Sequence, residues 1–267
     1  MTNALHLYGQ YIALSIRGQM QYRASFIMMS IAYFIGTGIE FVGIWGLFDR
    51  FAQLRSWTLA EVALFYGMVT MSMALTKTVS YGYDRFEDMV TSGDFDRLLL
   101  RPRSTALQLL SQRLQIARIG SIGQSFCVLA WACLELNVAW SPARLALLVA
   151  AIIGGSCIFK GLFILRATLC FWTTQGLDVT SALSYGGVET ARYPLNIYRA
   201  WFRRFFTYIV PLAFISYYPA LAILGRNDPL GSGRLLQWSA PLAGFAFLAI
   251  SLMVWGWGVR HYRSTGS

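Results

Sequence analysis

The chain has 267 residues, of which 56% are hydrophobic and only 13% are charged. This composition excludes an ordinary soluble globular domain and indicates a protein that lies largely within a membrane. The formal net charge of +10 does not indicate a nucleic-acid-binding protein, because the basic residues are spread among the ends of apolar segments and are not gathered on one solvated face.

The first 23 residues have the pattern of an amphipathic helix. Apolar residues recur every three or four positions from Leu5 to Met20, and polar residues such as Gln10 and Arg17 fall between them. This spacing predicts a helix that lies along the membrane interface before the first span. A polar extension of the first transmembrane helix is the alternative interpretation.

Six apolar segments follow, and we expect each of them to cross the bilayer, which takes about 20 residues per helix. Residues 219–240, before the last segment, are too short and too broken to cross. We expect them to dip into the outer face as a hairpin or re-entrant segment. The expected spans are residues 26–48, 59–77, 119–136, 145–163, 205–218 and 241–258.

Glu40 is the one carboxylate well inside an expected span. Ionisable residues within a membrane are costly and often functional, so a substrate or proton site is one interpretation. The other places Glu40 near the outer boundary, facing the bundle and hydrogen-bonded. We favour the second, because no other carboxylate or histidine stands near Glu40 in the sequence to build a relay.

A polar stretch, Tyr81–Leu110, separates the second and third expected spans and is called here the charged island. It holds five of the chain's 12 acidic residues. Gly93 and Pro102 interrupt it, which predicts two short helices joined by a turn. So dense a cluster of charge must lie in water or against another protein, and a plain solvated loop is the alternative to a docking element.

The basic residues predict the orientation in the membrane. If the amino terminus is cytoplasmic, 17 of the 22 lysine and arginine residues fall on the cytoplasmic side. This bias predicts that both termini and the loop of residues 81–117 are cytoplasmic. The same count places the polar stretch before the fifth expected span inside, with Arg192, Arg199, Arg203 and Arg204.

The sequence carries none of the motifs that mark a catalytic, metal or nucleotide site. Its two histidines, His6 and His261, lie at opposite ends of the chain, and its four cysteines form no CxxC pair. Neither lysine follows the glycine-rich loop of a nucleotide-binding P-loop. We therefore expect no enzymatic activity, metal or cofactor in this chain, and any ATP that drives it must be bound by another polypeptide.

Three strings resemble a known family. They are SGDFDRLLLRPRS at Ser92–Ser104, GIEFVGIWGLFDRF at Gly38–Phe51 and YYPALAILGRNDPLG at Tyr217–Gly231. Together with the order of the spans, they resemble the ABC-2-type permeases of ABC transporters, in particular a bacterial group described only as uncharacterised permease components. The resemblance covers nearly the whole chain.

The resemblance implies a role for the charged island. In that family, the loop between the second and third spans carries a coupling helix that sits in a cleft on a separate ATPase subunit. Residues 84–103 would be the coupling segment of this chain. The residues that would form it are Asp84, Arg85, Glu87, Asp88, Gly93, Asp94, Asp96, Arg97, Arg101, Pro102 and Arg103.

We therefore expect an all-α integral membrane protein with six transmembrane helices, formed as a single domain of residues 1–267 in the bacterial cytoplasmic (inner) membrane. The expected partners are ABC ATPase subunits, a second permease subunit of the same or similar sequence, and membrane lipid, without nucleic acid. Export is the direction that the resemblance implies. The alternatives are an ion-driven secondary transporter, for which paired intramembrane carboxylates would be typical, and a membrane scaffold or assembly protein.

Overall fold

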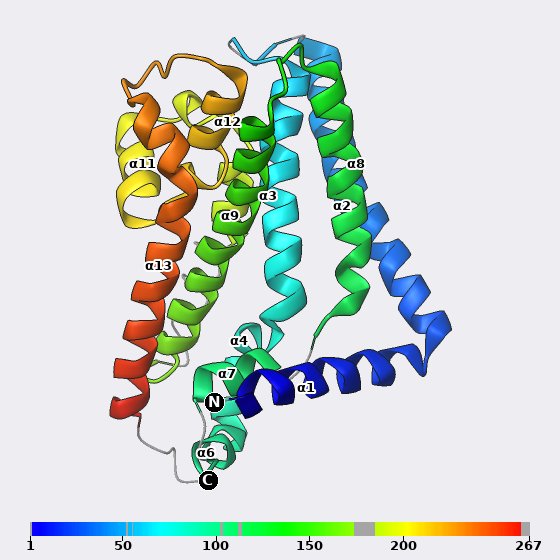
Figure 1. Ribbon diagram of the computed structural model, residues 1–267, viewed down its shortest axis with the longest axis vertical. Helices are drawn as coiled ribbons and strands as arrows, with labels where there is room; N and C mark the ends of the chain where they lie inside the picture. Colours follow the sequence, from blue (N-terminus) through cyan, green and yellow to red (C-terminus); the bar gives the residue numbers. More distant parts are fainter. Residues whose placement is uncertain are drawn as a thin grey trace.

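The computed structural model describes residues 2–51, 53–54, 56–101, 104–111, 114–173 and 185–262. Within these residues the regular structure is helical, and no β-strand is present. Figure 1 shows a bundle of long helices, with a shorter helix lying across one end of it. The long elements are α1 (Thr2–Met20), α2 (Arg23–Phe51), α3 (Leu59–Val79), α8 (Ile119–Glu135), α9 (Pro142–Leu169) and α13 (Arg234–His261).

Five helices are long and apolar enough to cross a membrane: α2, α3, α8, α9 and α13. They coincide with five of the six expected spans, and the short 3₁₀ helix η1 (Ile116–Arg118) leads directly into α8. The element α1 is separate from α2, because a turn at residues 21–22 divides them and α1 runs across the bundle (Figure 1). The first 20 residues are therefore a helix of their own.

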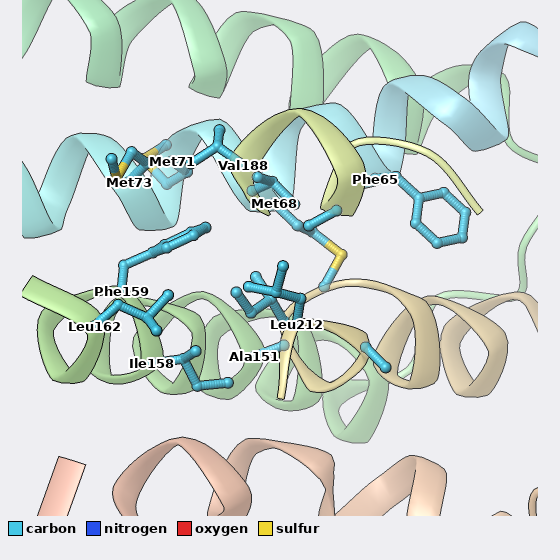
Figure 2. Close-up of a cluster of buried hydrophobic side chains, with 14 of the residues drawn as sticks. Phe65, Met68, Met71, Met73, Ala151, Ile158, Phe159, Leu162, Val188 and Leu212 are labelled. Atoms are coloured by element: carbon cyan, nitrogen blue, oxygen red, sulfur yellow. The ribbon is translucent and has the colours of Figure 1, made fainter. Parts of the chain in front are cut away.

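The core lies between α3 and α9. The side chains of α3 are almost entirely buried, and those of α9 are largely so, whereas α2 contacts the bundle along one edge. Figure 2 shows Phe65 and Met68 of α3 facing Ala151 and Phe159 of α9, with Val188 inserted between the two helices. Packing of this kind holds transmembrane helices together, since lipid removes the hydrophobic drive for their association.

Local signals set where these helices begin. Thr58 and Glu61 form a capping box at the start of α3, in which each side chain bonds the other residue's backbone amide. Ser141 caps α9, with Pro142 at the first position of that helix. A close approach then requires glycine: a Cβ at Gly244 of α13 would lie 2.1 Å from the carbonyl oxygen of Gly154 in α9.

The bundle has two distinct ends. The helix α1 and the charged island share one of them with the last turns of α13, and this is called the island end. Gln19 of α1 donates to the Leu114 carbonyl, and Tyr262, after α13, packs on Phe95 of the island with ring centroids 5.1 Å apart. The opposite end, called the loop end, holds residues 53–58 and 225–233.

Residues 196–226 leave the loop end and return to it. The Trp57 indole nitrogen donates to Asn196 Oδ1 at 3.1 Å. Arg226 donates to the Ser56 carbonyl at 3.1 Å and pairs with Glu61 at 2.7 Å. Both ends of the segment therefore meet the loop before α3 and the first turn of that helix, so the segment does not cross the bundle.

This re-entrant segment is formed by two short arms. The first is α11 (Ala200–Arg204) with η3 (Phe205–Ile209), and the second is η4 (Leu212–Phe214) with α12 (Tyr217–Leu224). The arms are bent by 77° at Pro211, which lacks the amide hydrogen that a continuous helix needs. Figure 1 shows both arms in the same half of the bundle.

Two expectations are corrected by these contacts. The apolar run of residues 205–218 is not the fifth span, because it dips and returns. Residues 219–240, expected as the outer hairpin, consist of the end of α12, a loop and the first turns of α13. The dipping element lies earlier in the chain than the sequence indicated.

Residues 185–196 run from the island end to the loop end, where Asn196 bonds Trp57. The Tyr185 hydroxyl donates to Asp84, in α4 (Tyr81–Asp84), at 3.2 Å, which places Tyr185 at the island end. Residues 185–191 are helical and η2 spans Leu195–Ile197, so Arg192 lies inside the bundle and not in a cytoplasmic loop. The chain then continues at the loop end with Arg199, Arg203 and Arg204. The basic-residue count had predicted these three residues at the island end.

Candidate functional site

The charged island folds as short helices packed under the bundle. They are α4, α5 (Phe86–Thr91), α6 (Asp94–Leu99) and α7 (Thr105–Ser111). Gly93 joins α5 to α6 with a φ of 74°, a left-handed conformation that favours glycine. The turn expected at this residue is present, and the island contains more short helices than the sequence indicated.

The helices α5 and α6 bury their apolar sides and expose most of their charges. Phe86 and Val90 of α5, and Phe95 and Leu98 of α6, are buried, whereas Arg97 between them is exposed. Because buried apolar and exposed charged residues alternate along these helices, one side of the island packs on apolar residues and the other carries the charges. The island is therefore a packed unit and not a solvated loop.

The floor is a cluster of aromatic rings from four parts of the chain. Trp255 of α13 lies 5.0 Å from Phe86 and 5.5 Å from Tyr83, between ring centroids. Phe171, just after α9, lies 5.2 Å from Trp255. The Trp255 indole nitrogen donates to Thr105 Oγ1 of α7 at 3.1 Å. The island is thus fixed to the ends of α9 and α13.

Tyr83 ties the same cluster to α7. Its hydroxyl donates to the Ala106 carbonyl at 3.1 Å. Burial raises the pKa of Tyr83 above its ordinary value, because an apolar setting disfavours the phenolate. Tyr83 therefore stays a hydrogen-bond donor at any physiological pH.

The outer side of the island carries two exposed ion pairs. Arg85 pairs with Asp88 at 3.3 Å and Arg97 pairs with Asp94 at 3.4 Å, and all four side chains are more than half exposed. Exposed pairs of this kind contribute about 0–1 kcal/mol. The four charges can therefore exchange partners at little cost when another protein docks.

Three leucines lie exposed among these charges, and the sequence did not single them out. Leu100 is 85% exposed, and Leu99 and Leu107 are also on the surface. Their neighbours in sequence, Leu98 and Leu109, are buried, so only the fold separates the two kinds. The exposed leucines and the charged residues beside them are called here the docking surface. It comprises Arg85, Asp88, Asp94, Arg97, Leu99, Leu100, Arg101 and Leu107.

The remaining predicted coupling residues have other positions. Asp84 faces the bundle, where it pairs with Arg166 of α9 at 3.2 Å. Glu87 and Asp96 are partly buried at the edge of the docking surface. Pro102 and Arg103 lie outside the described residues.

Glu40, the predicted intramembrane site, is bonded within the bundle. The Arg192 guanidinium donates to Glu40 at 2.6 Å and to Glu189 at 2.5 Å. Arg192 also lies over the Tyr66 ring, 5.0 Å from its centroid. The sequence did not indicate this cluster, because Glu40 and Arg192 are 152 residues apart. In addition, residues 189–192 have the composition of a solvated loop.

The described residues contain no group of three or more His, Cys, Asp or Glu side chains that could hold a metal ion. The clusters around Glu40 and Asp84 consist of carboxylates already paired with arginine. What the island offers chemically is a surface for protein contact, with mixed charge and three exposed apolar side chains.

Comparison with known proteins identifies the family. A family model described as ABC-2 family transporter protein matches residues 34–266. Searches of curated proteins and of solved structures found no match. The matched region includes the island, the re-entrant segment and the five long apolar helices, except for the start of α2. The chain therefore belongs to the ABC-2 family of transporter proteins and is a multi-pass membrane permease component of an ABC transporter.

Proposed function

We propose that this chain forms the translocation path of an ATP-driven exporter in the bacterial cytoplasmic membrane. Two copies, or one copy and a similar chain, enclose the path. Separate ATPase subunits bind and hydrolyse ATP, so this chain needs no cofactor of its own. The island end faces the cytoplasm, and an ATPase subunit docks on it.

One observation carries this proposal: the docking surface sits on the aromatic cluster that joins the island to α9 and α13. Leu100 supplies apolar contact area for a partner, and the pairs of Arg97 and Arg85 supply exchangeable charge. A partner that pulls on α6 moves Phe95, which packs on Phe171 and Trp255. Closure of an ATPase pair thereby becomes movement of two transmembrane helices.

The first test alters docking without altering the fold. Leu100→Asp changes a side chain that is 85% exposed, so the island still folds, and we expect the variant to lose the ATP-hydrolysing subunit that co-purifies from native membranes. Reversing the charges of Asp94, Asp96 and Arg97 together has the same expected effect. The matched control is Leu235→Asp at the loop end, where the side chain is 89% exposed.

The result that contradicts docking is ATPase co-purification that survives both Leu100→Asp and the triple charge reversal. If Leu235→Asp abolishes co-purification equally, the loss is a general effect of adding charge to this protein. Only a loss specific to the island supports the proposal.

A second test concerns the orientation. A cysteine in place of Ser92, on the island, and one in place of Ser232, at the loop end, are introduced separately after the four native cysteines are replaced. In intact cells a membrane-impermeant maleimide is expected to label the Ser232 position and to label the Ser92 position only after lysis. The reverse pattern overturns the orientation and, with it, cytoplasmic docking.

A further inference from the structure

A polar cavity of about 360 Å³ opens on the side of the bundle, and none of the residues of the docking surface lines it. Its walls come from α2, α3, the start of α8 and residues 185–192. The charged side chains that line it are Glu40, Lys77, Arg118, Glu189 and Arg192. Intramembrane ionisable groups mark function when they face a cavity.

Two of the cations in this cavity have no carboxylate partner in the described part of the chain. Lys77 lies over the Tyr185 ring, 4.6 Å from its centroid. Arg118 lies over the Tyr33 ring at 4.0 Å, and its Nε donates to the Gln115 side chain at 3.1 Å. The ion pairs of the described residues include neither cation.

The two carboxylates of the cavity are already engaged. Arg192 bridges Glu40 and Glu189 with its two terminal nitrogens. Asp84, the acid nearest to Tyr185, accepts from Arg166 and from the Tyr185 hydroxyl. Three cations, Lys77, Arg118 and Arg192, therefore stand against two carboxylates, so the lining carries one net positive charge. Lys77 and Arg118 also repel each other.

Buried hydrogen-bonding atoms without partners also line the cavity. Ser121 and Arg192 are both more than nine-tenths buried, and neither the Ser121 hydroxyl nor Arg192 Nε has a hydrogen-bond partner in the described structure. Such groups are rare, because a buried polar atom without a hydrogen-bond partner destabilises the folded state. Arg192 Nε can only donate, as can Lys77 and Arg118, and the Ser121 hydroxyl can donate as well, so one acceptor would satisfy these groups.

The surface of α2 beside the cavity is apolar and exposed. Glu40 is 45% exposed, and its neighbours on α2, Ile39 and Val42, are exposed as well. A second cavity, of about 610 Å³, lies between α1 and α2 at the island end and is lined by Tyr33, the ring under Arg118. A ligand that reaches Arg118 along this surface needs an apolar body.

We propose that the cavity binds the anionic group, a phosphate or carboxylate, of an amphipathic molecule. Lys77 and Arg118 neutralise the anion, and Ser121 and Arg192 Nε donate hydrogen bonds to it. This inference rests on the proposed function, since it names the class of cargo that the path would carry. It concerns residues that are distinct from the docking surface.

The test uses the full-length chain in phosphatidylcholine nanodiscs and measures the binding of fluorescently labelled phosphatidic acid. Lys77→Gln and Arg118→Gln each remove one charged partner, and we expect affinity to fall about 10- to 100-fold in each. Lys77→Arg keeps the charge and is expected to bind. Lys160→Gln is the matched control, since it removes a lysine that does not line the cavity.

Inorganic phosphate is tested in the same assay, as the soluble source of the same chemistry. If free phosphate displaces the labelled lipid at comparable concentration, the site recognises the anion alone and not an amphipathic molecule. Equal binding by wild type, Lys77→Gln and Arg118→Gln, or no binding of either probe, overturns the proposal. ATPase co-purification, measured in parallel, is expected to be unaffected by Lys77→Gln, so loss of the lipid site and loss of docking are separate outcomes.

Discussion

The aromatic cluster makes a testable prediction about how firmly the island is held. Trp255 is 2% exposed and touches α4, α5 and α6 through the rings of Tyr83, Phe86 and Phe95. The change Trp255→Ala removes these contacts and the hydrogen bond to Thr105. The docking surface itself is left intact.

The expected cost is about 3–5 kcal/mol, the usual range for a buried tryptophan replaced by alanine. This value applies because the cluster lies at the island end, where the last turns of α13 meet the island and the rings are buried from water. Since about 1.4 kcal/mol corresponds to a factor of ten, the open state of the island becomes roughly 100- to 4,000-fold more populated.

The measurement is amide hydrogen exchange in α5 and α6, which reports local opening. We expect exchange in these helices to accelerate by that factor, while exchange in α3 stays unchanged. Trp257→Ala is the matched control, because Trp257 is 55% exposed and stacks on Trp172 and not on the island. Unchanged exchange in Trp255→Ala, or equal acceleration in Trp257→Ala, would refute the view that this cluster holds the island.

Three further predictions concern other parts of the bundle. Gly244→Leu forces a side chain into the backbone of α9 and is expected to abolish recovery of monodisperse protein. The control Gly256→Leu, which has open space around it, is expected to leave recovery normal. Equal recovery of the two variants would contradict the close packing of α9 and α13. Arg192→Leu leaves Glu40 without its cation and is expected to cost about 1.5–3 kcal/mol, seen as a lower melting midpoint that Arg192→Leu combined with Glu40→Leu partly restores. Gly93→Val is expected to cost about 1–2 kcal/mol because of its left-handed conformation, so an unchanged melting midpoint would argue against that turn.

The sequence predicted the regular part of this fold well. The helices α3 and α8 begin where expected, at Leu59 and Ile119, because a long apolar run has few ways to satisfy its backbone other than a helix in lipid. The break at Gly93 was also predictable, since it depends on the residue's own conformational freedom. Signals of this kind are local.

The path of residues 185–196 through the bundle could not be predicted in the same way. Residues 189–192 carry Glu189 and Arg192 and therefore read as a wet loop, although Glu40, far away in the sequence, pairs with Arg192 inside the bundle. Residues 205–218 read as a span for the opposite reason. They are apolar because they pack within the bundle, and the sequence does not say that both ends of the segment return to the same loop.

The candidate docking surface was predicted only in its charges. Arg97 and Asp94 stand out because charge is scarce in this chain, but Leu100 looks like any other leucine in the run Leu98–Leu100. Leu98 is buried whereas Leu99 and Leu100 are exposed, and this difference depends on the tilt of α6 over the aromatic cluster. That tilt is set by Trp255, 150 residues or more away in the sequence.

The glycine contacts between α9 and α13 have a mechanical consequence. A Cβ would collide with the facing helix at Gly154, Gly161, Gly244 and Gly258, so the close contact recurs along the length of the pair. Two helices in close contact at several points resist sliding past each other and bend together as one unit. A displacement applied to this helix pair at the island end therefore reaches the loop end, beside the two arms of the re-entrant segment, nearly undiminished.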